Sequence, residues 1–201
     1  MKTLVIVDAL YDFMPGGSLE VPDGNEIVPV INKIMDKFDL VVATQDWHPP
    51  EHMSFASNHE GKKPFDTIDD NGMEQILWPD HCVQGSKGAE FHKDLKTNPL
   101  EAVFRKGMDP KIDSYSGFYD NHHLKKTGLA GYLREKGAEK LYFCGLAADI
   151  CVYFSIKDAV KEGFASSLIT DATKPLKADD YEKQKKEYAE LDVDLIESSD
   201  I

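Results

Sequence analysis

Residues 3–8 have the sequence TLVIVD, a short run of β-branched and apolar residues that ends at the carboxylate of Asp8. Apolar and polar residues do not alternate in this run, as they would in a strand with one face in water. We therefore expect a strand that is covered on both faces, which is typical of a parallel sheet.

The chain continues as strands that alternate with helices. A helix is expected over residues 25–38, where Ile27, Ile31 and Ile34 recur at helical spacing, and a second buried strand over residues 40–44. The remaining elements are expected as strands at residues 102–105, 141–144, 168–170 and 193–196, and as helices at residues 127–137, 150–162 and 179–191. This alternation predicts the α/β class, with a right-handed, mostly parallel sheet between layers of helices.

An irregular stretch, residues 46–100, interrupts this pattern within what we expect to be a single domain over residues 1–201. It is rich in Pro, Gly, Asn, His and Asp. A connection of this length in a compact domain usually has a function. We expect it to bind metal and substrate.

Charge and composition exclude several classes of protein. The chain has 201 residues, 36 acidic and 23 basic side chains and a net charge of −13, which disfavours nucleic acid and anionic lipid as partners. No apolar run approaches the roughly 20 residues that cross a bilayer, and the N-terminal run is too short for a signal peptide, so we expect a cytoplasmic protein. Three cysteines, Cys82, Cys144 and Cys151, cannot form a disulfide framework and include no C-x-x-C motif.

Polar residues follow the predicted strands at the points where they end. Asp8, Asp46, Lys106 and the turn over residues 145–151 all occupy such positions. Ligands of open α/β sheets bind beyond the carboxyl ends of the strands. We therefore expect these residues to meet at one edge of the sheet.

The chemistry expected at this edge is that of a cysteine nucleophile. Cys151 lies near a predicted helix N-terminus, which favours thiolate, with Asp8 as proton acceptor and Lys106 as stabilising cation. A less specific interpretation remains open, in which Cys151 packs as a small apolar residue, Asp8 caps a turn and Lys106 is a solvated charge.

A divalent metal site is expected beside it. Asp46, His48 and His81 offer one carboxylate and two imidazoles, a set compatible with zinc, iron or manganese. Further ligands could come from the same loop region, from Glu51, His52, His59, Asp66 or Glu74, although each also fits a surface position. Four aromatic residues could line a flat aromatic substrate or belong to the core: Phe13, Trp47, Trp78 and Tyr115. The remaining histidines, His92, His122 and His123, are expected to be solvent-exposed or capping residues.

Five separated motifs together resemble those of the bacterial nicotinamidases, which belong to the isochorismatase-like cysteine hydrolases. They are VDALYDFMPGGSLEVPDG from Val7, TQDWHPPEHMSFASNH from Thr44, WPDHCVQGSKGAEFH from Trp78, VFRKGMDPKIDSYSGF from Val103 and GLAADICV from Gly145. The resemblance implies a three-layer α/β/α domain with about six strands. It also implies hydrolysis of nicotinamide, and of pyrazinamide, in pyridine-nucleotide salvage.

Site roles follow from the same resemblance. Asp8 would be the proton acceptor, Lys106 the triad cation and Cys151 the nucleophile. The metal, expected to be Zn²⁺ with Fe²⁺ or Mn²⁺ as alternatives, would be held by Asp46, His48 and His81 with water, and His52 would lie in the second sphere.

The resemblance further implies a cis peptide between Leu146 and Ala147, and an oxyanion hole formed by the amides of Ala147 and Cys151. The substrate ring would lie against a group of five residues: Phe13, Trp78, Tyr115, Leu146 and Ala147.

Three residues depart from the usual motifs: Leu10, Ala148 and Ile150 replace an amide, a hydroxyl and an aromatic ring, which bears on substrate range. Rival hypotheses are a related hydrolase of carbamoyl or ureido compounds and a catalytically silent binding module. A nucleotide-binding regulator is disfavoured, because no G-x-G-x-x-G or P-loop follows the first strand. A homo-oligomer is compatible with the sequence.

Overall fold

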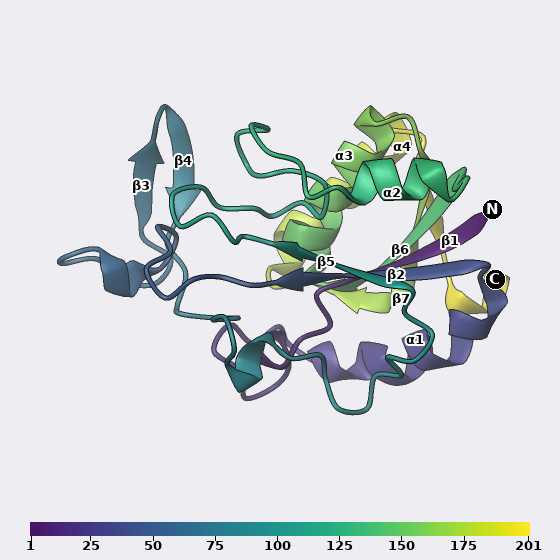
Figure 1. The fold of residues 1–201 in the computed structure, drawn as a ribbon, viewed down its shortest axis with the longest axis horizontal. Helices are drawn as coiled ribbons and strands as arrows, with labels where there is room; N and C mark the ends of the chain where they lie inside the picture. The colour runs from purple at the N-terminus through teal and green to yellow at the C-terminus, as the bar shows by residue number, and fades with distance from the viewer.

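A six-stranded, wholly parallel sheet forms the centre of the protein, described over residues 1–201 by a computed structural model (Figure 1). The strand order is β5-β2-β1-β6-β7-β8, and every pairing is parallel. The strands are β1 (Lys2–Val7), β2 (Leu40–Asp46), β5 (Ala102–Lys106), β6 (Lys140–Leu146), β7 (Ala165–Lys174) and β8 (Asp194–Ile196).

Helices cover both faces of the sheet, which confirms the three-layer α/β/α expectation. One face carries α1 (Ile27–Ile34), and the other carries α2 (Leu129–Glu135), α3 (Tyr153–Lys161) and α4 (Ala178–Glu190) (Figure 1). Successive residues of β1 enter opposite cores: Leu4 and Ile6 pack on the α1 side, and Val5 and Val7 on the other. The unbroken apolar run therefore reflects burial on both faces, as predicted.

Several boundaries differ from the predictions. The 25–38 segment is α-helical only over α1 and has a 3-10 turn at each end, and β7 is longer than the predicted strand at residues 168–170. The segment predicted as a helix from residue 150 begins with a π-helical turn, Ala148–Val152, before α3 starts.

A hairpin in the irregular stretch was not predicted. Strands β3 (Thr67–Asp70) and β4 (Met73–Ile76) pair antiparallel around Asn71-Gly72, both with positive φ. Five of their eight side chains are polar and the apolar ones do not alternate regularly with them, so the pattern that marks a half-buried strand is missing, although Asn-Gly is a strong hairpin-turn signal. The hairpin stands at the carboxyl end of the sheet, away from both chain termini (Figure 1).

One surface prediction was wrong. Among the remaining histidines, His122 is half-buried and pairs with Asp70 of the hairpin, at 2.7 Å. The charged helix α4 buries Tyr181 and Tyr188 in the core that also contains Val5 and Val7. No helix in the structure combines the length and the apolar composition that a membrane span requires.

Candidate active site

Four buried side chains from four strand ends meet at the carboxyl edge of the sheet. Lys106 Nζ lies 2.9 Å from Asp8 Oδ2 and 2.7 Å from Asp46 Oδ1, and donates to Cys151 Sγ at 3.5 Å. Register explains the meeting, because Asp46 and Lys106 are direct partners in β2 and β5. The predicted convergence is confirmed.

The connection after β6 brings Cys151 to this group. Gly145 has φ +111, and a Cβ there would lie 2.6 Å from the backbone nitrogen of Val7 in β1, so only glycine fits this close approach. The Leu146–Ala147 peptide is cis, as the resemblance implies. The π-helical turn then carries Cys151 and orients its sulfur toward Lys106.

Burial dominates the protonation of this group. It raises the pKa of the Cys151 thiol well above its ordinary value, with only partial opposition from Lys106, and it raises the pKa of Asp8. Burial would lower the pKa of Lys106, but Asp46 and Asp8 together hold it well above the ordinary value. Lys106 is therefore a cation and Cys151 a neutral thiol.

Asp8 is arranged to accept a proton. Its Oδ1 accepts a hydrogen bond from Thr44 Oγ1 at 2.7 Å, whereas Oδ2 is held only by the ion pair with Lys106. A carboxylate oxygen of Asp8 lies within 4.8 Å of Cys151 Sγ. A thiol and a carboxylate with a free lone pair at this separation can exchange a proton.

Asp46, His48 and His81 form a second buried group whose ligand atoms lie within 4.8 Å of one another. His48 Nδ1 binds the carbonyl of Gly107 at 2.9 Å and His81 Nδ1 binds that of Pro79 at 2.8 Å. Each Nδ1 is thus held by a backbone carbonyl, and both Nε2 atoms face Asp46 Oδ2, at 3.3 and 3.7 Å. Backbone carbonyls that fix the tautomer in this way are typical of metal-binding histidines, so the residues fit a divalent cation.

His52 lies beside this group rather than in it. Its ring centroid is 4.3 Å from that of His48, and its Nδ1 and Ser54 Oγ are 2.7 Å apart. Burial, with a contribution from His48, lowers the pKa of His52 to about 4. The other proposed ligands, Glu51, His59, Asp66 and Glu74, do not join the Asp46 group.

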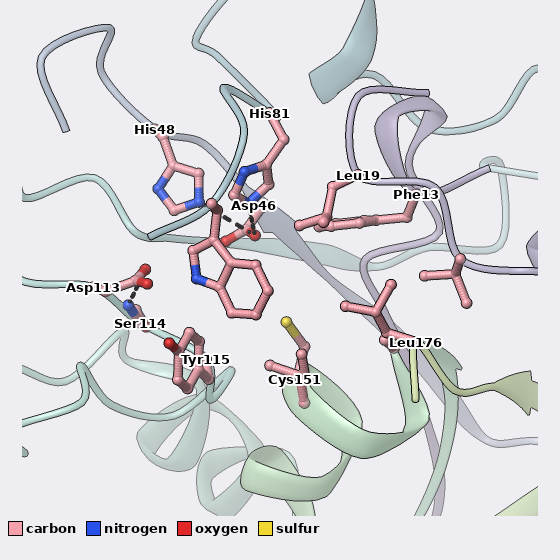
Figure 2. Close-up of a pocket in the computed structure, with 14 residues that line it drawn as sticks. Phe13, Leu19, Asp46, His48, His81, Asp113, Ser114, Tyr115, Cys151 and Leu176 are labelled. Atoms are coloured by element: carbon pink, nitrogen blue, oxygen red, sulfur yellow. Dashed lines mark hydrogen bonds and ion pairs between the residues drawn. The ribbon is translucent and has the colours of Figure 1, made fainter. Parts of the chain in front are cut away.

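Cys151 of the first group lines one pocket together with Asp46, His48 and His81. In Figure 2 the sulfur of Cys151 points into this space, and His48 and His81 stand at its other end beside Asp46. The predicted residues Phe13, Trp78, Tyr115 and Ala147 line it.

Two predicted positions do not line the pocket. Leu146 belongs to the apolar core at the end of β6, and Trp47 stacks on the guanidinium of Arg105, 3.9 Å from the ring centroid. Six further lining residues were not predicted from the sequence: Leu19, Val21, Asp113, Ser114, Ile150 and Leu176. Ile150 alone of these had been singled out, as a departure from the motif, whereas Leu10 and Ala148 are buried away from the pocket.

The model of the isochorismatase domain matches residues 2–200. The chain belongs to the isochorismatase family. A curated relative, the nicotinamidase of Acinetobacter baylyi, is 47% identical over 173 residues, which cover 86% of this chain and 81% of the relative.

Solved structures of this family superpose along nearly the whole chain. The nicotinamidase/pyrazinamidase of Acinetobacter baumanii has a TM-score of 0.96 at 44% identity and covers 99% of this chain and 97% of its own. The PnC1 protein of L. infantum, in complex with nicotinate, has a TM-score of 0.88 at 39% identity, with 99% and 93% covered. The pyrazinamidase of Pyrococcus horikoshii, in complex with zinc, has a TM-score of 0.81 at 36% identity, with 98% of each chain covered.

Proposed function

We propose that this protein is a cysteine amidohydrolase that converts nicotinamide to nicotinate and ammonia in pyridine-nucleotide salvage. The observation that carries the proposal is that Cys151, which contacts Lys106, lines the same pocket as Asp46, His48 and His81. The names of the family members at 36 to 47% identity support this substrate and pyrazinamide as a second one. We further propose a cytoplasmic enzyme that can form homo-oligomers.

The first half of the reaction forms a thioester. Asp8 takes the proton of Cys151, and the sulfur attacks the carboxamide carbon. Negative charge develops on the carbonyl oxygen, where the amides of Ala147 and Cys151 would donate; the Ala147 amide donates no hydrogen bond within the chain. The carbon–nitrogen bond then breaks, and Asp8 returns the proton to the departing ammonia.

The second half releases the acid. A water molecule gives a proton to Asp8 while its oxygen attacks the thioester carbonyl, and the carbon–sulfur bond breaks. The proton passes to the sulfur, which restores the thiol of Cys151. Lys106 keeps its proton throughout, because two carboxylates raise its pKa. Its charge offsets that of the sulfur in both halves.

Asp46, His48 and His81 would hold the metal, for which we propose Zn²⁺, with Fe²⁺ and Mn²⁺ as alternatives. When bound, the cation supplies a Lewis acid for the ring nitrogen and so fixes the carboxamide next to Cys151. Lys106 orients the site by binding Asp46 Oδ1, which leaves Oδ2 directed at the two imidazoles. Phe13, Trp78 and Tyr115 would surround the ring, and His52 would act from the second sphere.

Ammonia release from nicotinamide tests the proposal. Cys151→Ala should abolish release, whereas Cys144→Ala, which alters a buried cysteine inside β6, should retain it. Metal content measured on the same samples should be unchanged in both variants. Release by Cys151→Ala, or none by the folded, metal-loaded wild type, would refute this function. A hydrolase of ureido compounds would work without the metal, so loss of activity on chelation separates the two hypotheses.

A further inference from the structure

The carboxylate of Asp12 joins two loops that line opposite parts of the pocket. Its Oδ2 accepts the backbone N–H of Cys82 at 2.7 Å, and its Oδ1 accepts that of Ser18 at 3.3 Å. Asp12 directly precedes Phe13, and Cys82 directly follows His81. The rings of Phe13 and His81 pack 5.6 Å apart.

The backbone of Cys82 requires such a partner. Its φ is +46, in the left-handed region that non-glycine residues adopt rarely and at a cost. Cys82 is fully buried, and removal of the carboxylate would leave its N–H without the protein acceptor that it has now. The hydrogen bond that Asp12 accepts therefore stabilises the left-handed conformation of Cys82, the residue directly after His81.

Gly88 provides independent evidence that space is reserved for this carboxylate. A Cβ at Gly88 would overlap the Asp12 side chain, and its three nearest atoms would all be carboxylate atoms of Asp12. The φ of Gly88 is not in the left-handed region, so the backbone does not require glycine there. Glycine is therefore required at position 88 only because a side chain there would occupy the space of the Asp12 carboxylate.

We propose that Asp12 is a positioning residue that fixes His81 for metal binding and Phe13 for ring packing, with Gly88 as the space that admits it. The inference rests on the proposed function for the identity of the metal group. Asp12 touches neither metal nor substrate in this account; it acts through the Cys82 amide.

A double-variant experiment tests the proposal with Zn²⁺ affinity, measured by chelator competition, as the readout. Asp12→Ala and Gly88→Ala should each weaken Zn²⁺ binding by about tenfold or more, the loss typical of supporting residues around a metal. In the double variant, Gly88→Ala should add little to Asp12→Ala, because the carboxylate it would overlap is gone. Asp12→Asn, which keeps one acceptor oxygen, should recover part of the affinity.

Two matched controls accompany these variants. Asp36→Ala removes an exposed aspartate, and Gly131→Ala adds a methyl group where no atom lies within 4 Å. Both should bind Zn²⁺ as the wild type does. Single-variant affinities equal to the wild type, or fully additive losses in the double variant, would overturn the proposal.

Amide hydrogen exchange in metal-free protein gives a readout that does not depend on folding yield or turnover. The Cys82 amide should exchange faster in Asp12→Ala, while amides inside β1 keep their protection. Unchanged protection of Cys82 would overturn the proposal. A wild type that fails to hydrolyse nicotinamide would refute the proposed function alone, since exchange and Zn²⁺ binding are measured without substrate.

Discussion

Gly107 is the position where a single methyl group should damage the metal site most directly. It has φ +65, and its carbonyl binds His48 Nδ1 at 2.9 Å. A Cβ there would lie 2.5 Å from Nδ1 and closer still to Cε1, whereas real Cβ contacts essentially never fall below 3.0 Å. The imidazole, the backbone or both would have to move by about half an ångström.

Gly107→Ala should therefore lower both stability and metal affinity. A left-handed alanine costs roughly 1–2 kcal/mol. Displacement of His48, and of the carbonyl that fixes its tautomer, should weaken Zn²⁺ binding by about 10- to 100-fold. Chelator competition measures the affinity and thermal unfolding of metal-free protein measures the stability.

Gly137→Ala is the matched control for this variant. Its φ is +73, but no atom lies within 4 Å of the added methyl group. It should show a similar loss of stability and unchanged Zn²⁺ affinity, so the difference between the two variants isolates the contact with His48. Gly107→Ala that binds Zn²⁺ within twofold of the wild type would refute the reasoning.

Three further predictions concern the reaction. Asp8→Asn should lower kcat by about 10²-fold or more with little change in KM, because the base that accepts the Cys151 proton is lost; steady-state kinetics that show a loss in KM alone would assign Asp8 to binding. The rate of Cys151 alkylation in metal-free protein should still increase with pH beyond about pH 8.5, the ordinary thiol pKa. Burial raises the pKa of Cys151, so the thiolate forms only at higher pH. An alkylation rate that levels off near neutral pH would contradict this prediction. Ile150→Ala should raise kcat/KM for ring-substituted nicotinamides relative to nicotinamide itself, since Ile150 lines the pocket, and an unchanged ratio would remove it as a determinant of substrate range.

The sequence predicted the site best for residues whose place is determined by the topology of the sheet. Asp8, Asp46, Lys106 and Cys151 follow four strands of one parallel sheet, and parallel strands bring their carboxyl ends to a common edge. Their meeting could be predicted without knowledge of any loop. That Asp46 and Lys106 are direct cross-strand partners could not be predicted, because the apolar pattern does not determine the register of β2 and β5.

Long-range loop contacts were not predictable. Asp113 and Ser114 reach the pocket through the fold of the segment after β5, and Leu176 through the connection from β7 to α4. Neither segment has an apolar periodicity from which the direction of its side chains could be predicted. The roles of Gly88 and Gly107 depend on atoms distant in sequence, a carboxylate and an imidazole, so no local pattern reveals them.

For Leu146, the position in a motif did not predict where the side chain lies. Leu146 adjoins Ala147 in the GLAADICV region, yet its side chain turns into the core because it ends a buried strand, whereas Ala147 lines the pocket. Neighbours in a motif can thus serve different parts of the molecule. Ile150 was recognised as a departure from the motif, but only the structure separates it from Leu10 and Ala148 as a lining residue.

The central claim, that Cys151 attacks the carboxamide, is tested most directly by mass spectrometry of metal-loaded enzyme quenched with acid during turnover of nicotinamide. We predict a nicotinoyl adduct on the peptide that contains Cys151, absent from the peptides of Cys82 and Cys144 and released by hydroxylamine as a thioester is. Rapid ammonia release with no adduct on Cys151 at any quench time, together with turnover by Cys151→Ala, would contradict the account.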